Sequence, residues 1–238
     1  MPDLPRAILF DLDDTIISAG PRGLLLRTLA EEIAGLLPMP PEEAARALEA
    51  ANREFWSDQE RHREWRFRLE SARTAIVEKM FESWRAQAPG LTPLVAREFG
   101  ARFHRLREEN ACFPGAVETI DELKGRGVLL ALVTNGAAEA QRAKVARFDL
   151  ARRFDHVQIE GEAGFGKPEE RAYRHALEAL GARPQEAWMV GDNLEWEVAA
   201  PQRLGIFGIW HDHLGEGLPR DATVRPDRII RTLTELLG

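Results

Sequence analysis

The residues best suited to chemistry stand near the start of this chain, in the run Phe10-Asp11-Leu12-Asp13-Asp14-Thr15. An apolar stretch of strand character, residues 6–10, leads directly into two carboxylates spaced by two, and a threonine follows two positions later. Carboxylates this close at a strand end repel each other unless a cation offsets their charge. In an open α/β sheet, ligands bind just outside the carboxyl ends of the strands. The run therefore predicts a site for a metal ion and an anionic ligand.

Strand-like and helical stretches alternate after Pro114, which predicts right-handed βαβ units and a parallel sheet. We expect a Rossmann-like α/β core with helices on both faces, to which residues 6–10 contribute the first strand. Pro168 is expected at the first position of one helix, and Gly125 and Gly181 at helix C-termini. The predicted strands are 128–133, 156–159, 187–190 and 206–210, and residues 228–230 fit either an edge strand or a helix start. The predicted helices lie near 115–124, 137–147, 168–180, 194–204 and 228–237.

Residues 16–112 contain no convincing strand and instead repeat apolar residues at helical spacing. Thr92 is expected to cap the last helix of this block, with Pro93 as its first residue. The apolar repeats cover residues 25–37, 44–55, 65–84 and 95–106. We therefore expect a core of residues 1–15 and 113–238, and an all-helical domain of residues 16–112 inserted after the first strand.

Polar groups also follow the later strands of the predicted sheet. Thr134 and Asn135 follow the second strand, Lys167 precedes the helix after the third, and Asp192 follows the fourth. The carboxyl ends of parallel strands share one edge, so these groups are expected to converge with Asp11. Carboxylates, a lysine, and hydroxyl and amide donors together suit Mg²⁺ with a phosphoryl group, because Mg²⁺ takes its ligands from carboxylate, water and phosphate oxygens.

This combination resembles the motifs of the haloacid dehalogenase (HAD) superfamily, and the likeness covers nearly the whole chain. The inserted helical block resembles the C1-type cap of its phosphatase-like members. The four matching segments are Phe10-Asp11-Leu12-Asp13-Asp14-Thr15, Thr134-Asn135-Gly136, Lys167-Pro168 and Gly191-Asp192-Asn193. The resemblance implies a phosphoric monoester hydrolase that acts on a small phosphorylated metabolite with Mg²⁺.

By similarity, Asp11 is the nucleophile and forms an aspartyl-phosphate. Asp13 is the general acid for the leaving alcohol and then the base for water. Members that resemble dehalogenases lack an acid at that position, because a halide needs no proton. Asp13 therefore favours phosphate esters, and Thr15 also fits the phosphatase-like pattern.

The resemblance also implies a set of binding groups. Thr134 and the amides near Asn135 and Gly136 hold phosphoryl oxygens, and Lys167 pairs with Asp11 and the phosphate. The family usually has a second acid four or five residues after the last motif's aspartate. Glu197 is expected to fill that role and to reach the metal through water, with Glu195 a weaker candidate. The implied metal ligands are Asp11, the backbone carbonyl of Asp13, and Asp192.

Composition limits the other function classes. The chain has 238 residues and a net charge of −7, which argues against bulk binding of nucleic acid. It has one cysteine, Cys112, and no apolar run long enough to cross a bilayer, so we expect a cytoplasmic protein without a membrane partner. The sequence leaves monomer and homodimer open. His211-Asp212-His213 looks like a metal site, but we expect a polar loop after the last major strand.

Four alternatives remain besides the phosphatase. A phosphomutase or a dehalogenase-type hydrolase of the same superfamily shares most of the expected residues. A phospho-acceptor signalling module also combines acids, a threonine and a lysine around Mg²⁺, but it has no inserted helical domain and needs no general acid. A catalytically idle binding protein would not need Asp11, Asp13, Lys167 and Asp192 together.

Overall fold

The computed structural model describes residues 4–238, which divide into two compact units. One unit runs up to Ser18 and resumes at Ala111–Gly238, and the other is Ala19–Asn110. These limits lie two or three residues inside the expected insertion of residues 16–112. The difference arises from two short strands that were not expected, β2 (Ile17–Ser18) and β3 (Ala111–Cys112), which pair in antiparallel register.

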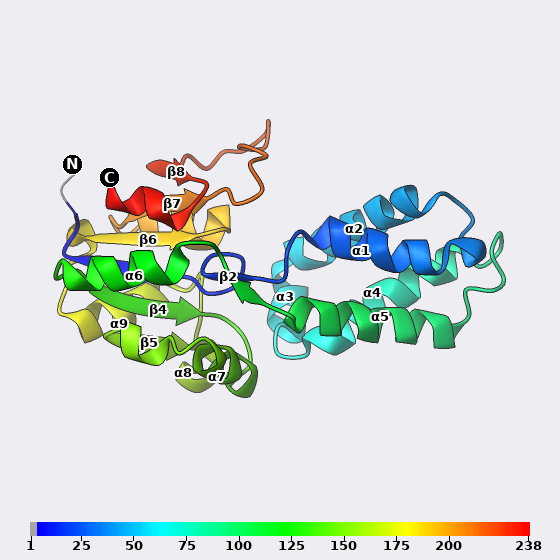
Figure 1. The fold of residues 1–238 in the computed structure, drawn as a ribbon, viewed down its shortest axis with the longest axis horizontal. Helices are drawn as coiled ribbons and strands as arrows, with labels where there is room; N and C mark the ends of the chain where they lie inside the picture. The colour runs from blue at the N-terminus through cyan, green and yellow to red at the C-terminus, as the bar shows by residue number, and fades with distance from the viewer. Residues whose placement is uncertain (1–3) are drawn as a thin grey trace. The chain divides into compact units, whose positions relative to one another are not determined.

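A parallel sheet lies at the centre of the first unit (Figure 1). Its order within the described residues is β5-β4-β1-β6-β7-β8, so that β1 is central and pairs with β4 and β6. The strands are β1 (Ala7–Phe10), β4 (Leu129–Thr134), β5 (His156–Ile159), β6 (Ala187–Gly191), β7 (Phe207–His211) and β8 (Arg228–Ile230). The predicted α/β class with a parallel core sheet is confirmed, and residues 228–230 form the edge strand.

Helices cover both faces of this sheet and bury its central strand on both sides. Ile8 and Phe10 pack into one apolar cluster with helix α6 (Ala116–Gly125), and Ala7 and Leu9 pack into another with helix α9 (Glu170–Leu180). The remaining helical segments are α7 (Ala138–Arg147), η2 (Ala151–Arg153), α8 (Glu160–Ala163), η3 (Pro184–Glu186), the π-helical turn η4 (Leu194–Ala199), α10 (Ala200–Gln202) and η5 (Leu233–Leu237).

Several predicted helix ends were wrong. Pro168 does not open α9: Glu169 is the N-cap, and the chain stays outside the helix up to that point because the Lys167 backbone is bonded to Asn135. Gly181 is the left-handed C-cap of α9 and Gly125 is the last residue of α6, so both lie at helix C-termini as predicted; the left-handed residue after α6 is Gly127. The expected helix 194–204 is a π-helical turn followed by a short helix, and the final segment is β8 followed by η5.

The second unit is built from helices around its own apolar cluster, to which Leu29, Leu48, Phe81 and Phe99 contribute. The expected continuous helix 65–84 is interrupted between α3 (Gln59–Trp65) and α4 (Leu69–Trp84). The sequence did not reveal this interruption, because the helical spacing of the apolar residues continues across a break of one turn. Its helical segments are α1 (Arg22–Glu32), η1 (Ala34–Leu36), α2 (Pro41–Ser57), α3 (Gln59–Trp65), α4 (Leu69–Trp84) and α5 (Pro93–Glu108). The predicted cap of α5 is confirmed, because the Thr92 hydroxyl accepts from Val95 N at 3.3 Å.

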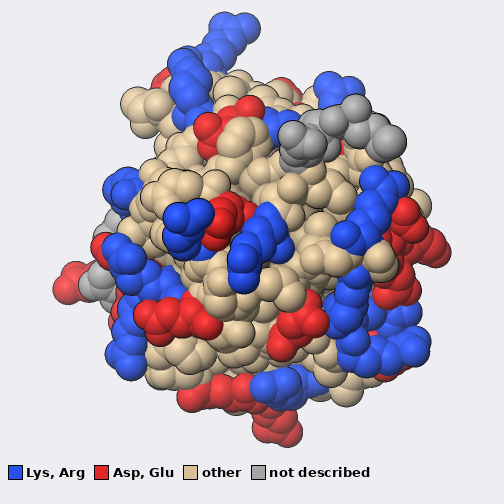
Figure 2. Space-filling view, turned by 90° about the vertical axis from the view of Figure 1, so that its left-hand side faces the viewer, with Lys and Arg blue, Asp and Glu red and all other residues tan. Residues whose placement is uncertain are grey.

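The surface mixes charges of both signs. Figure 2 shows basic and acidic side chains interspersed over the face that it presents. Among the described residues, no helix combines the length and apolar character that a membrane crossing requires. The local surroundings of each charge therefore matter more for binding than the net charge of the chain.

Close packing of α4 against α5 depends on Gly100. A Cβ atom on this buried residue would lie 2.6 Å from Thr74 Cα, so a side chain cannot fit without moving the backbone. We expect Gly100→Ala to lower the free energy of unfolding by about 1–3 kcal/mol, although alanine is the better helix former. Urea unfolding measures the change.

Gly125→Ala is the matched control, because Gly125 is exposed at the end of α6 and a Cβ atom on it would have no neighbour within 4 Å. It should be neutral or stabilising by up to about 1 kcal/mol. Equal stability of the two variants would show that α4 and α5 can separate at no cost.

Candidate active site

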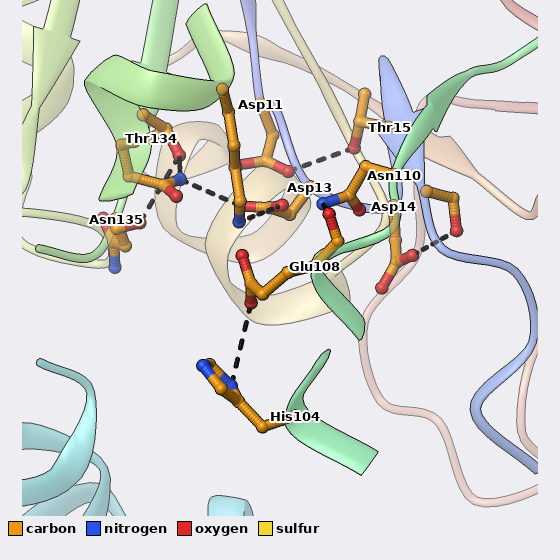
Figure 3. A network of polar contacts seen from close by, with 12 residues as sticks. Asp11, Asp13, Asp14, Thr15, His104, Glu108, Asn110, Thr134 and Asn135 are labelled. Carbon is orange, nitrogen blue, oxygen red and sulfur yellow. Dashed lines mark hydrogen bonds and ion pairs between the residues drawn. The ribbon is translucent and has the colours of Figure 1, made fainter. Parts of the chain in front are cut away.

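Asp11 lies directly after the central strand β1 and is nearly buried. Its backbone N–H donates to the Val190 carbonyl at 2.9 Å, which continues the pairing of β1 with β6. The Thr15 hydroxyl donates to Asp11 Oδ2 at 3.2 Å, and Lys167 Nζ donates to Oδ1 at 2.5 Å (Figure 3 shows the Thr15 contact). Each carboxylate oxygen of Asp11 therefore has its own donor.

Lys167 joins two buried carboxylates. Its ammonium group lies 2.5 Å from Asp11 Oδ1 and 2.8 Å from Glu197 Oε1, and both Lys167 and Glu197 are 1% exposed. Burial raises the pKa of Asp11 and raises that of Glu197 to about 7, while the lysine charge opposes both shifts. Burial lowers the pKa of Lys167, but the charges of Asp11 and Glu197 outweigh it and leave that pKa above its ordinary value. The lysine is therefore protonated at neutral pH.

Asp192 follows β6 and adds further negative charge. The Trp210 indole N–H donates to the Asp192 backbone carbonyl at 2.8 Å, which fixes this turn against β7. Burial raises the pKa of Asp192 well above its ordinary value, and the charges of Glu197 and Asp11 add to that shift. Asp192 thus lies where an ionised carboxylate needs a cation to stabilise it.

The donor chemistry of these residues fits Mg²⁺. Carboxylates of Asp11 and Asp192 and the carbonyl of Asp13 are oxygen donors of the kind that Mg²⁺ prefers. Within residues 4–238, no group of three or more His, Cys, Asp and Glu side chains is placed to hold a metal ion. The metal ligands expected from the sequence are only two carboxylates and one backbone carbonyl, so this metal site does not require three such side chains. Glu197, expected to reach a metal through water, faces Lys167 and accepts from Asn193 N at 2.8 Å.

Asn135 and Gly136, both expected to hold phosphate, have partners within the protein. The Asn135 amide binds the Lys167 backbone twice: Nδ2 donates to the carbonyl at 2.7 Å, and Oδ1 accepts from the N–H at 2.9 Å. The Gly136 N–H donates to Glu160 Oε2 at 3.1 Å. A Cβ on Gly166 would lie 2.6 Å from Asn135 Oδ1 and from the Glu160 carboxyl group, so only glycine allows these segments to meet. Asn135 therefore holds the backbone that carries Lys167, whereas Gly136 is bonded to α8.

Asp13 is held by two residues that were not predicted from the sequence. Gln141 Nε2 donates to Asp13 Oδ2 and Lys144 Nζ donates to Oδ1, both at 2.8 Å (Figure 3 shows Asp13 beside Asp11). Gln141 also donates to the Thr134 hydroxyl at 2.5 Å. Gln141 and Lys144 lie three residues apart on α7, which begins just after Thr134-Asn135-Gly136, and that spacing places them on one face of the helix. The spacing shows that they share a face, but nothing in the sequence indicated that this face meets Asp13.

The segment His211-Asp212-His213 is structural within the described residues. His211 ends β7 and is buried, and burial together with neighbouring His213 lowers its pKa to about 4. Asp212 accepts from the backbone N–H groups of Glu216 and Gly217 at 3.1 and 2.9 Å, so it orders the loop that follows. The predicted polar loop starts one residue later than expected, because His211 belongs to β7.

Comparison with known proteins places the chain in a family. The family model described as haloacid dehalogenase-like hydrolase matches residues 5–205. This chain belongs to that family. The predicted superfamily and the predicted hydrolase class are thereby confirmed.

Curated relatives of this HAD-like hydrolase carry phosphatase names. It is 39% identical over 160 residues to a phosphoserine phosphatase from Thermus thermophilus, a match that covers 67% of this chain and 63% of that protein. It is 28% identical over 236 residues to a glyceraldehyde 3-phosphate phosphatase from Pyrococcus furiosus, which covers 98% and 91% of the two chains.

Solved structures share the fold of this HAD-like hydrolase. The HAD-hydrolase YfnB from Bacillus subtilis superimposes with a TM-score of 0.71 at 22% identity, over 98% of this chain and 97% of that one. Other structures with this fold are those of dehalogenases, so the fold alone does not separate phosphate esters from haloacids.

Loss of the Lys167 charge should destabilise the protein strongly. Lys167→Met leaves Asp11 and Glu197 buried without a cation, and we expect the free energy of unfolding to fall by about 3–5 kcal/mol. Adding Glu197→Gln should recover part of that loss. Urea unfolding in EDTA measures both variants without a contribution from bound metal.

Lys124→Met is the control, because Lys124 pairs with Asp155 at 3.0 Å with both side chains about one-third exposed. Exposed pairs contribute roughly 0–1 kcal/mol, so this variant should stay close to the wild type. A loss in Lys167→Met no larger than in the control would contradict the role given to the buried lysine.

His211 should make stability depend on pH. Its pKa is about 4 in the folded chain against 6.5 for an exposed histidine, so below pH 6.5 the unfolded chain binds a proton that the folded chain does not. Stability present above pH 6.5 is therefore lost as the pH falls towards 4, by about 3 kcal/mol at 1.4 kcal/mol per pKa unit. His211→Gln should lack this component. Unfolding free energies from pH 4 to 7.5 test it, and parallel pH profiles for the two proteins would refute it.

Proposed function

We propose that this chain hydrolyses phosphate monoesters of small metabolites with Mg²⁺ as cofactor. The observation that carries the proposal is Asp11, which is buried at the end of the central strand and bonded to Lys167 at 2.5 Å, with Asp13 two residues on. A nucleophile held by a cation is suited to attack on a phosphate that carries negative charge. The phosphatase names of the curated relatives support the same reaction.

Two carboxylates divide the chemistry in this proposal. An oxygen of Asp11 attacks phosphorus, the bond from phosphorus to the leaving oxygen breaks, and Asp13 gives its proton to that oxygen. Water then attacks the phosphorus of the acyl phosphate on Asp11, Asp13 takes a proton from the water, and inorganic phosphate and free Asp11 result. Lys167 stabilises the negative charge on Asp11 and on the phosphoryl oxygens, and Thr134 donates a hydrogen bond to one of them.

Asp11, Asp192 and the carbonyl of Asp13 would hold the metal. When bound, Mg²⁺ supplies positive charge that reduces repulsion between Asp11 and the phosphate and stabilises charge in the transition state. The raised pKa of Asp192 supports this assignment, since burial and the nearby carboxylates disfavour its ionised form until a cation is present.

Asp13 favours phosphate esters over haloacids. An alkoxide leaving group needs a proton, whereas a halide does not, so a dehalogenase gains nothing from an acid at this position. The names of the relatives point to small phosphate monoesters such as phosphoserine and glyceraldehyde 3-phosphate. A cytoplasmic location stays a prediction, as does the lack of nucleic-acid and membrane partners.

A phosphatase assay tests the proposal. Wild-type protein should release inorganic phosphate from 4-nitrophenyl phosphate and from a panel of small phosphate monoesters with Mg²⁺ present, and EDTA should abolish turnover. Asp11→Asn should reduce kcat by about a thousandfold or more, since a nucleophile cannot be replaced by the remaining groups. A phosphorylated peptide containing Asp11, trapped by rapid acid quench, should appear only in the wild type.

The matched control is Asp121→Asn, because Asp121 is half-exposed and pairs with Arg153 away from Asp11. It should keep wild-type kcat and KM. Turnover that survives Asp11→Asn would refute the mechanism. Halide release from 2-haloacids would indicate a dehalogenase, transfer to a second sugar phosphate a mutase, and stable phosphorylation without turnover a signalling module.

A further inference from the structure

Helix α7 places one donor against each oxygen of the Asp13 carboxylate. Gln141 Nε2 lies 2.8 Å from Oδ2, and Lys144 Nζ lies 2.8 Å from Oδ1. Asp13 stands in a loop between β1 and β2, and its own side chain is 38% exposed. The two contacts therefore fix a carboxylate that the loop alone leaves partly open to solvent.

Gln141 is an unusual residue for the buried face of a helix. Val145, one turn along, is the other buried residue of α7, and Gln141 is 3% exposed. A buried amide is costly unless it is hydrogen-bonded, and both N–H groups of Gln141 have an acceptor, one in Asp13 and one in Thr134. The amide nitrogen of Gln141, which only donates, faces both Asp13 and Thr134.

This orientation also determines what the Thr134 hydroxyl can do. Its oxygen accepts from Gln141 at 2.5 Å, so its single proton must point elsewhere. The contact that uses this proton is to the Asn135 carbonyl at 3.4 Å, which is long for a hydroxyl donor. A phosphoryl oxygen is a better acceptor, and Thr134 is left as a donor for it.

Lys144 supplies the charge of the pair. Its side chain is 12% exposed and lies along α7 with its ammonium group on Asp13. An ion pair that is partly shielded from water holds its geometry better than an exposed one, because solvent screens it less. Lys144 thus restrains the oxygen of Asp13 that Gln141 does not bind.

We propose that Gln141 and Lys144 are positioning residues for the general acid. They hold the Asp13 carboxyl group in the position from which it gives its proton to the leaving group. Gln141 also keeps Thr134 as a donor to the phosphoryl group. The inference rests on the proposed phosphatase function and extends it to two residues on α7. Neither residue needs to touch the reacting atoms.

The leaving group provides the test. An alkoxide needs a proton from Asp13, whereas 4-nitrophenolate leaves without one, so misplacing the acid should slow the transfer of phosphate to Asp11 from the alkyl ester only. The value of kcat/KM reports this step, because it does not include the later attack of water, in which Asp13 acts as base for both esters. We expect Lys144→Met to lower kcat/KM for an alkyl phosphate by about 10–100-fold and kcat/KM for 4-nitrophenyl phosphate by less than about 3-fold. Lys144→Arg should restore much of the difference, because it keeps a charged donor.

Gln141→Met should show the same selective loss. It should also weaken inhibition by inorganic phosphate more than Lys144→Met does, since it releases Thr134. Thermal melting of each variant checks folding. Because the Lys144 side chain is more exposed than that of Gln141, its variants should fold and give a result even where a Gln141 variant does not fold.

Arg142→Met is the matched control. Arg142 lies on the same helix, carries the same charge and pairs with Glu162 at 2.5 Å, 47% exposed. It should leave the ratio of the two kcat/KM values unchanged. Asp13→Asn is the benchmark for the proposed function and should show the largest leaving-group dependence.

The outcomes separate the two claims. If Asp13→Asn lowers kcat/KM for both esters equally, the acid role assigned to Asp13 fails. If Asp13→Asn is selective while Lys144→Met and Gln141→Met either change nothing or lower kcat/KM for both esters equally, the positioning role fails and the phosphatase function stands.

Discussion

The contact of Lys167 with two buried carboxylates is the interaction on which the rest of the site depends. It joins the end of β1 to the loop before α9 and to the π-helical turn η4. Charges removed from water remain stable only when their geometry is good and their other hydrogen bonds are made. The neighbouring contacts supply part of these hydrogen bonds: Thr15 donates to Asp11, Asn135 binds the Lys167 backbone, and the Asn193 N–H donates to Glu197 Oε2.

Much of the fold and part of the site could be predicted, because both depend on patterns within short stretches of the sequence. A strand buried on both faces gives a continuous apolar run, and Ala7–Phe10 is such a strand. In a parallel sheet the polar residue after each run must lie at one edge, which brought Asp11, Lys167 and Asp192 into one prediction. The same rule applied to residues 156–159 would have found Glu160, which directly follows β5 and binds Gly136.

What could not be predicted depends on contacts between distant segments. Gln141 and Lys144 belong to a charged helix, where such residues ordinarily face water, and nothing near them indicates a partner 128 and 131 positions away. Asn135 was expected to bind a ligand, yet its amide matches the N–H and carbonyl of Lys167, 32 residues on. Sequence spacing identifies residues that share an element, whereas these pairs depend on how the elements meet.

The short β2–β3 ribbon has a consequence for the history of such chains. Because Ile17 pairs with Cys112 and Ser18 with Ala111, the chain leaves the sheet unit and returns to it at adjacent points. The two ends of the 92-residue segment 19–110 therefore lie close together. The number of residues in it can change without moving β1 or the loop that carries Asp13. An insertion joined in this way can be lengthened, shortened or exchanged by recombination while the strands of the sheet unit are inherited intact.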